Sequence, residues 1–187
     1  MKRTLASLSA LMIACLGLSS AAFGKELIQL KNAKGESVGR VILYNGMRGL
    51  RIQLNLKNLP PGEHAVHIHQ VAVCEARADK PHEAFKSAGP YFNPDGRKLG
   101  MKDFDEPLSG DSPNITVGPD GVANVGMDAP HAKLFGRWDG LWENGGAAIV
   151  IHANGDDTTN RQGGNAGDRI ACGVVAKPKD YKTSGTH

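Results

Sequence analysis

Short segments in which apolar and polar residues alternate constrain the fold of this chain more than any other feature. Alternation with a period of two, together with many β-branched residues, is typical of strands that bury one face. Turn sequences such as Asn45-Gly46 separate these segments, and no segment has helical periodicity over a useful length. We predict an all-β domain, a Greek-key β-sandwich or barrel of about eight antiparallel strands. The segments are residues 26–31, 38–44, 50–56, 64–69, 114–117, 122–127, 147–152 and 169–175.

The segment at residues 62–69 holds three of the seven histidines in the chain. In a strand, His67 and His69 lie on one face, whereas Val66 and Ile68 lie on the other. Two imidazoles on one rigid face favour a copper or zinc site, because both metals bind imidazole well. A polar strand face turned toward water fits the same spacing, so this segment alone leaves both interpretations open.

Two long segments interrupt the strand pattern, at residues 71–113 and 153–168, and both are rich in Gly, Pro, Asp and Asn. Loops of this length in a compact domain are usually functional or disordered. Each follows a histidine-bearing strand, which favours function. A shorter loop at residues 128–146 carries Trp138 and Trp142, to which we assign packing and no chemistry.

The N-terminus has the pattern of a secretory signal. Lys2 and Arg3 precede an apolar run at residues 5–18, and Ala22-Phe23-Gly24 resembles a small-x-small cleavage site. We predict a signal peptide at 1–24, a mature domain at 25–176 and a polar, poorly ordered tail at 177–187. Lipoprotein processing at Cys15 is the weaker alternative, because the apolar run continues past it. Either route predicts a periplasmic or secreted protein.

The net charge bears on the partners of the protein, and the cysteines bear on a possible disulfide. The formal net charge of +3 falls to +1 without Lys2 and Arg3, which gives no reason to expect nucleic acid or an anionic membrane as partner. Cys74 and Cys172 remain once Cys15 leaves with the signal. Two cysteines in a secreted chain most simply form one disulfide, and two free buried thiols are the less favoured alternative.

Four motifs spread over residues 27–175 carry a resemblance to a known family. With them the chain resembles the copper–zinc superoxide dismutases of the secreted bacterial type, whose fold is a β-sandwich. The motifs are Leu59-Pro60-Pro61-Gly62-Glu63-His64 with His67-Ile68-His69; Phe85-Lys86-Ser87-Ala88-Gly89-Pro90-Tyr91-Phe92-Asn93-Pro94; Ile149-Val150-Ile151-His152 with Asp156-Asp157; and Gly163-Gly164-Asn165-Ala166-Gly167-Asp168-Arg169-Ile170-Ala171-Cys172-Gly173-Val174.

The resemblance implies a role for each matching histidine. His67, His69 and His152 match three of the four copper ligands of the family. His64 matches a histidine that braces the backbone instead of binding metal. Asp156 matches an aspartate that hydrogen-bonds metal-ligating imidazoles.

The resemblance also implies roles for an arginine and the cysteines. Arg169 matches the arginine that attracts superoxide to the copper, although a structural arginine satisfying loop carbonyls is the alternative. Cys74 and Cys172 match the intrasubunit disulfide that ties the long loop to the sheet.

The zinc site of the family is largely absent from this sequence. Its bridging histidine is replaced by Tyr91, and its two other histidines align with Leu99 and Leu108. Asp111 alone remains, and one aspartate is a poor zinc site when four ligands are the rule. We therefore expect copper as the cofactor and no zinc, with the two leucines packing the vacated space and Asp111 accepting a hydrogen bond within its loop.

Two alternatives concern the copper site itself. Tyr91 either completes the copper coordination through its oxygen or is a packed aromatic, and the sequence favours neither.

The remaining histidines are interpreted as solvated surface residues: His82, His131 and His187.

These features predict a periplasmic copper-only relative of the dismutases that converts superoxide to oxygen and hydrogen peroxide. The alternative is a periplasmic copper carrier or buffer on the same scaffold with little turnover. A purely structural sandwich is disfavoured, because all three copper histidines are present. The resemblance leaves a homodimer open.

Overall fold

The computed structural model describes residues 24–96, 108–156 and 165–183. The predicted signal segment up to residue 23, Leu99 and His187 lie outside the described residues. Within the described ranges the chain is almost entirely β-structure and turns, and none of its helices is long and apolar enough to cross a membrane. The elements are β1 (Glu26–Asn32), β2 (Ser37–Gly46), β3 (Gly49–Leu56), β4 (Gly62–His64), β5 (Val66–His69), the 3₁₀ turns η1 (Pro81–Glu83) and η2 (Lys86–Ala88), β6 (Ile115–Val117), β7 (Ala123–Ala129), β8 (Ala147–His152) and β9 (Arg169–Val175).

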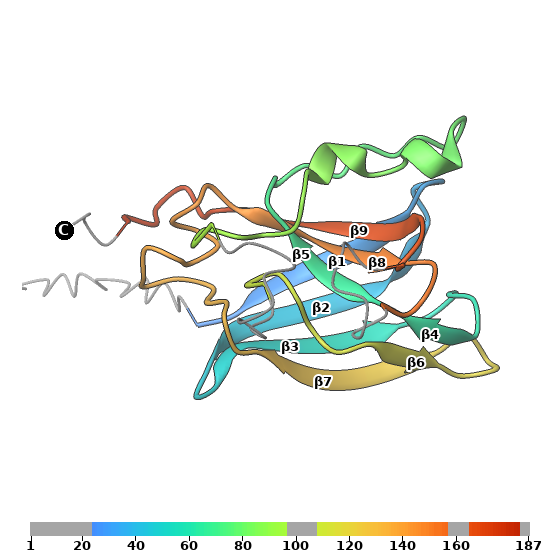
Figure 1. Cartoon of the computed structure of the whole chain (residues 1–187), viewed down its shortest axis with the longest axis horizontal. Coiled ribbons are helices and arrows are strands. Elements are labelled where there is room, and N and C mark those ends of the chain that lie inside the picture. The colour runs from blue at the N-terminus through green and yellow to red at the C-terminus, as the bar shows by residue number, and fades with distance from the viewer. Residues whose placement is uncertain (1–23, 97–107, 157–164, 184–187) are drawn as a thin grey trace, which may run out of the picture.

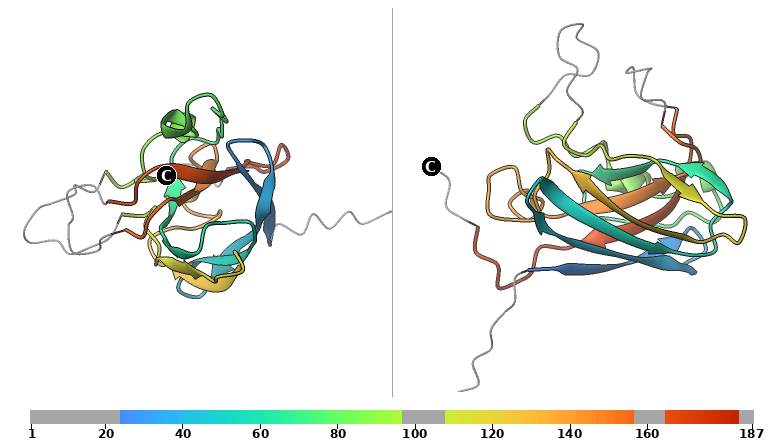
Figure 2. Two further views of the ribbon diagram at one scale, coloured as in Figure 1. Left: turned by 90° about the vertical axis from the view of Figure 1, so that its right-hand side faces the viewer. Right: turned by 90° about the horizontal axis from the view of Figure 1, so that it is seen from below.

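The strands form one large curled sheet and one small sheet, and every pair of neighbours is antiparallel. The large sheet has the order β5-β8-β9-β1-β2-β3-β7, and β4 pairs with β6. Its curl brings the β5 and β7 sides toward each other (Figures 1 and 2). The chain crosses from one side of the large sheet to the other between β3 and β5, with β4 on the way, and again in the long connection between β7 and β8. The predicted all-β, antiparallel fold class is confirmed.

The histidine segment forms two strands instead of the single strand that we predicted, so the described residues contain nine strands. The break is at Ala65. Before it, His64 is paired with Ile115 of β6; after it, Val66 is paired with Ile151 of β8. The residue at the break bonds to the chain just beyond β8, since the Ala65 amide donates to the Asn154 carbonyl at 2.8 Å. The break follows from this change of partner strand, which local sequence does not encode.

The two faces of the sheet bury different sets of residues. Alternate side chains such as Leu43, Ile52 and Ile68 fill the concave side and form the main core, as period-two alternation requires. A smaller apolar cluster lies on the opposite face, where Phe85 packs with Val150 and Cys172. The long loop after β5 therefore has its own apolar contact with the sheet.

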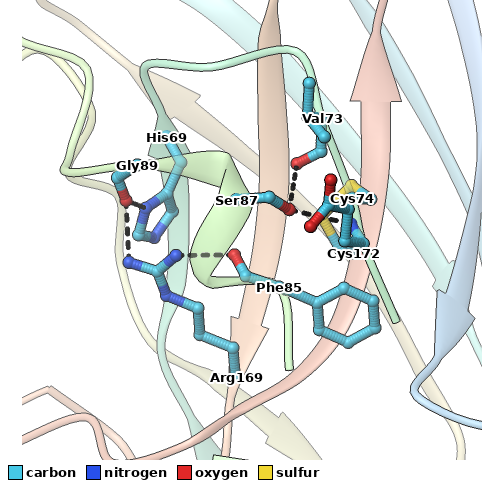
Figure 3. Close-up of a disulfide and its surroundings, with 9 residues drawn as sticks. His69, Val73, Cys74, Phe85, Ser87, Gly89, Arg169 and Cys172 are labelled. Atoms are coloured by element: carbon cyan, nitrogen blue, oxygen red, sulfur yellow. Dashed lines mark hydrogen bonds between the residues drawn. A yellow bond between two sulfur atoms is a disulfide. The ribbon is translucent and has the colours of Figure 1, made fainter. Parts of the chain in front are cut away.

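The disulfide fixes the same loop covalently. Cys74 and Cys172 are bonded, with 5.8 Å between their Cα atoms and a sequence separation of 98, so the predicted pairing is confirmed. Next to the disulfide, Ser87 Oγ accepts a hydrogen bond from the Glu75 amide at 2.8 Å (Figure 3). The loop is thus held to β9 where it folds back across the sheet.

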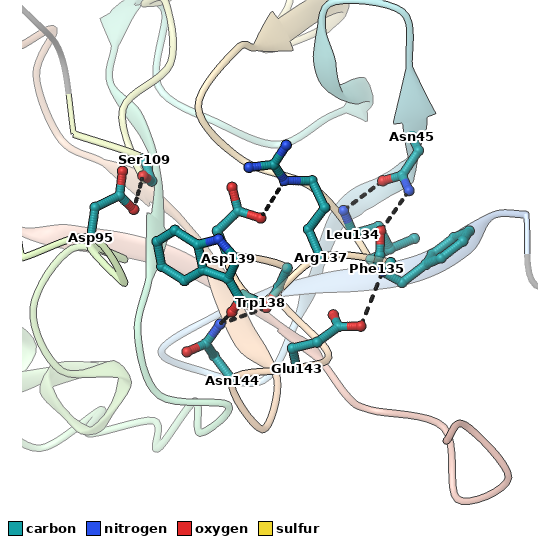
Figure 4. A network of polar contacts seen from close by, with 12 residues as sticks. Asn45, Asp95, Ser109, Leu134, Phe135, Arg137, Trp138, Asp139, Glu143 and Asn144 are labelled. Atoms are coloured by element: carbon teal, nitrogen blue, oxygen red, sulfur yellow. Dashed lines mark hydrogen bonds and ion pairs between the residues drawn. The ribbon is translucent and has the colours of Figure 1, made fainter. Parts of the chain in front are cut away.

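The loop between β7 and β8 is organised by side-chain hydrogen bonds to its backbone (Figure 4). Asn45, at the end of β2, donates to the Phe135 carbonyl at 2.8 Å and accepts from the Leu134 amide at 2.7 Å. Trp142 is 1% exposed and belongs to the core, whereas Trp138 is 60% exposed. Packing therefore accounts for Trp142, while Trp138 lies mostly at the surface.

The segment after β9 contacts the domain through one aromatic side chain, a contact that we did not expect in a polar tail. The Tyr181 ring lies 5.0 Å from that of Trp142 and 6.2 Å from that of Phe135. Its hydroxyl donates to the Glu143 carboxylate and accepts from the Gly136 amide. Tyr181 thus packs against the loop between β7 and β8, although its neighbours in sequence are mostly polar.

We expect the disulfide to contribute about 4–5 kcal/mol to the free energy of unfolding, because a bond across roughly a hundred residues restricts the unfolded chain strongly. Urea unfolding of the oxidised protein and of the Cys74→Ala/Cys172→Ala variant measures the difference. A difference below about 1 kcal/mol would contradict this expectation.

Candidate metal centre

Strand pairing brings three histidines together on the face of the sheet opposite the main core. His67 and His69 alternate on β5, where they are paired with Val150 and Ala148 of β8. His152 lies two residues beyond Val150 and is therefore a diagonal neighbour of His67 on the same face. Candidate ligand atoms of the three imidazoles all lie within 4.8 Å of one another. The structure thus brings together the three residues that we predicted as copper ligands.

The three imidazoles are shielded from water and are neutral. His67, His69 and His152 are 1%, 0% and 4% exposed. Burial lowers the pKa of His67 and of His69 to about 3, and it lowers the pKa of His152 as well. Neutral imidazole is the form that binds a metal.

Backbone carbonyls select which nitrogen of His69 and His152 is free. His69 Nδ1 donates to the Gly89 carbonyl at 2.8 Å, and His152 Nδ1 donates to the Gly167 carbonyl at 3.2 Å. A neutral imidazole has one N–H, so the Nε2 atom of each carries a lone pair. These two Nε2 atoms face each other at 3.3 Å. Two facing lone pairs repel, and a cation bound by both removes the repulsion.

Asp156 makes the corresponding selection for His67. A carboxylate oxygen accepts hydrogen bonds only, so His67 Nε2 donates to Asp156 Oδ2 at 3.1 Å. Its Nδ1 is buried and has no hydrogen-bond partner among the described residues. Each of the three imidazoles therefore keeps one unprotonated nitrogen for a metal. Three neutral imidazoles suit copper, since Cu(I) accepts three nitrogen ligands.

His64 is occupied by the backbone on both sides of its ring. Its Nδ1 lies 2.8 Å from the His152 carbonyl oxygen, and its Nε2 lies 2.8 Å from the Pro60 carbonyl oxygen. Neither nitrogen is free for a metal. The contacts tie β4 to the end of β8, which is the bracing position expected from the sequence.

Tyr91 lies beside the three histidines. An antiparallel bridge places it opposite His69, and its ring centroid is 4.3 Å from that of His67 and 5.1 Å from that of His69. Burial, with the nearby charges of Asp156 and Asp111, raises the pKa of Tyr91 to about 12. The hydroxyl therefore remains a phenol unless a cation contacts it.

Leu108 and Asp111, which the resemblance aligned with zinc ligands, lie together in a hydrogen-bonded loop. Leu108 is 5% exposed, and its amide donates to Asp111 Oδ2 at 2.7 Å. Asp111 is therefore a hydrogen-bond acceptor within its loop, as expected, and burial raises its pKa. Leu108 belongs to neither of the apolar clusters formed by the described residues, and its predicted contact with Leu99 stays a prediction because Leu99 lies outside those residues.

Arg169 is bonded to the long loop next to the histidines. Its Nη1 donates to the Phe85 carbonyl and its Nη2 to the Gly89 carbonyl, each at 2.7 Å (Figure 3). Gly89 also accepts from His69, so one carbonyl connects the arginine to the site. The guanidinium charge contributes to the lowered pKa of all three histidines. Arg169 thus satisfies loop carbonyls and also carries a positive charge close to the site.

Several polar contacts of the site were not predicted from the sequence. The Gly89 and Gly167 carbonyls orient two imidazoles, yet a backbone carbonyl leaves no mark in a sequence. Asn114 bonds to the backbone of Asp156, and its only signal was a turn sequence before a strand. Among the histidines assigned to the surface, His82 has a side chain that is 85% exposed, and it is bonded to Asp168.

Comparisons with known proteins agree with this geometry. A model of the copper/zinc superoxide dismutase (SODC) family matches residues 37–175. A copper–zinc superoxide dismutase of Aquifex aeolicus is 40% identical over 173 residues, which cover 90% of this chain and 98% of the relative. The superoxide dismutase-like protein YojM of Bacillus subtilis is 35% identical over 164 residues, which cover 84% of this chain and 79% of the relative.

A solved structure extends the agreement to the fold. The crystal structure of a SOD-like protein from Bacillus subtilis superimposes with a TM-score of 0.69 at 34% identity, covering 80% of this chain and 97% of the other. The family match spans most of the strands and all three clustered histidines. The chain belongs to the copper/zinc superoxide dismutase family.

Proposed function

We propose that this protein is a copper-dependent superoxide dismutase that works without zinc. The observation that carries the proposal is the cluster of His67, His69 and His152, in which each buried imidazole keeps one unprotonated nitrogen. Copper held by these three residues would supply the one-electron chemistry, oxidising one superoxide to oxygen and reducing the next to peroxide.

The protein residues around the cluster suit a small anionic substrate. Arg169 provides a fixed positive charge, because its two hydrogen bonds to loop carbonyls hold the guanidinium in place. A cation fixed beside a buried site attracts a small anion by diffusion. The Tyr91 phenol holds a proton close to the histidines, since its pKa is raised, and it is a candidate proton donor or a ligand oxygen when a cation is present.

The absence of zinc is proposed from the residues at the corresponding positions. Leu108 offers no ligand atom, and one carboxylate oxygen of Asp111 already accepts a hydrogen bond from the Leu108 amide. Structural zinc sites almost always have four ligands. Two candidate oxygens, on Asp111 and Tyr91, fall short of that number.

We also propose that residues 1–24 are a signal peptide and that the domain at 25–176 works in the periplasm. The disulfide supports this location, because disulfides persist in oxidising compartments. Residues 177–183, which follow the proposed domain, contact its loop before β8 through Tyr181. A homodimer remains compatible with the proposal.

We expect the mature protein to bind one copper ion and no zinc. His67→Ala, His69→Ala or His152→Ala should each abolish retention of copper, because only two of the three imidazole ligands would be left. His82→Ala is the matched control, since that exposed histidine lies outside the cluster, and it should retain copper fully. Metal analysis after dialysis against both ions measures this, and zinc retained one-to-one beside copper would refute the expectation.

We expect copper-loaded, zinc-free protein to accelerate superoxide decay, and we expect Arg169→Gln to lower the second-order rate constant about tenfold at low ionic strength. The loss should shrink as salt screens the charge. Arg169→Lys should recover part of the rate, because it restores the charge. Stopped-flow measurement of superoxide decay at several salt concentrations gives these constants.

Arg40→Gln is the matched control for this experiment, because it removes the same charge from an exposed position on β2, and its rate should equal that of the wild type. Copper affinity should be the same in all variants. A wild-type rate no greater than that of copper on an unstructured peptide, at full occupancy, would contradict the enzyme and leave the copper carrier as the function.

A further inference from the structure

Asn114 holds both backbone groups of Asp156. The Asp156 amide donates to Asn114 Oδ1 at 2.9 Å, and Asn114 Nδ2 donates to the Asp156 carbonyl at 3.0 Å. These two residues are 42 positions apart, so the side chain of Asn114 spans two loops instead of closing its own turn. A side-chain amide that bonds both groups of one residue fixes its backbone much as a neighbouring strand would.

Asn114 is itself held by regular structure. It directly precedes β6, which pairs with β4. Two residues before it, Ser112 Oγ donates to the Val66 carbonyl of β5 at 2.6 Å. The position of Asn114 is therefore set by strands on both sides, and it can transmit that position to Asp156.

The space around this contact is tight. A Cβ atom added to Gly155 would lie 3.0 Å from Asn114 Nδ2 and 3.2 Å from Glu63 Oε2. Such distances are shorter than nine in ten real Cβ contacts, so the neighbouring side chains would have to shift by a few tenths of an ångström. Glycine at 155 thus lets the loop approach Asn114 closely enough for both hydrogen bonds.

Asp156 connects this fixed backbone to the histidine cluster through a hydrogen bond. Its Oδ2 accepts from His67 Nε2 at 3.1 Å, which leaves His67 Nδ1 as the buried nitrogen without a partner. If the Asp156 backbone moved, the carboxylate would no longer select that tautomer. The path from Asn114 to His67 is made entirely of hydrogen bonds between described residues.

We propose that Asn114 is a positioning residue for the copper site, which acts through Asp156 to keep His67 in the Nε2–H tautomer before any metal arrives. The metal identity in this statement rests on the proposed function, whereas the tautomer does not. In a family whose zinc-site histidines this chain lacks, the Asn114 bracket orders the loop that carries Asp156 without a second metal.

The test uses the mature protein with Asn114→Leu, which keeps the approximate volume and removes both hydrogen bonds. Nitrogen-15 NMR of the metal-free protein at neutral pH should show the Nε2–H tautomer of His67 in the wild type and a mixture of tautomers in the variant. Copper affinity, measured by competition with a chelator, should fall about tenfold, the lower end of the range for groups that orient metal ligands.

Three further variants isolate the mechanism. Asn124→Leu is the matched control: Asn124 accepts a 3.0 Å hydrogen bond from Asn55 at an exposed position, and its loss should leave tautomer and affinity unchanged. Gly155→Ala should shift both quantities in the same direction as Asn114→Leu, and it serves if the latter does not fold. In an Asp156→Ala background, Asn114→Leu should cause no further loss of affinity, because both act on one path.

An unchanged His67 tautomer in both Asn114→Leu and Gly155→Ala would overturn the proposal. So would an equal loss of affinity from Asn114→Leu with and without Asp156. If the wild type binds no copper or leaves superoxide untouched, the proposed function fails, while the tautomer measurement in metal-free protein still decides the role of Asn114.

Discussion

The structure of the site depends on one electrostatic constraint: three neutral imidazoles meet in a place that water does not reach. Each neutral ring has a single N–H group, and each donates it in a hydrogen bond to a partner outside the cluster. The partners are the Gly89 carbonyl, the Gly167 carbonyl and the Asp156 carboxylate. The lone pairs are therefore left facing one another, and this arrangement is unfavourable without a cation. The site is prepared for a metal by what surrounds it.

The two long loops carry these three hydrogen-bond acceptors. The first loop presents the Gly89 carbonyl, and it is fixed by the disulfide, by the packing of Phe85 against the sheet and by Arg169. The second presents the Gly167 carbonyl and Asp156 from its two ends. Because His69 and Arg169 share one carbonyl, the charge that would attract an anion and the orientation of a candidate ligand depend on the same loop.

Much of this structure follows from sequence patterns of period two. The pattern predicted the strands, the shared face of His67 and His69, and an antiparallel fold. The position of His152 beside them depends on the register between β5 and β8, which came only with the family resemblance. The divided strand at Ala65 could not be predicted, because it results from a change of partner and not from a local signal.

The remaining differences have the same origin in long-range contacts. Residues 177–183 contact the domain through Tyr181 and Trp142, and the polar composition of the segment gave no sign of this contact. The bracket between Asn114 and Asp156 joins two loops, each of which has the sequence of an ordinary turn. Such features are set by tertiary proximity, so a single sequence gives their residues but not their partners.

The orientation of the three imidazoles predicts that His67 Nδ1, His69 Nε2 and His152 Nε2 bind copper, with no metal beside Asp111. A crystal structure of the copper-loaded, zinc-exposed protein, with anomalous scattering recorded at both metal edges, tests this most directly. The predicted result is one copper on those three nitrogens and no zinc signal near Asp111 and Tyr91. Zinc at that position, or copper bound through His67 Nε2, would contradict the claim.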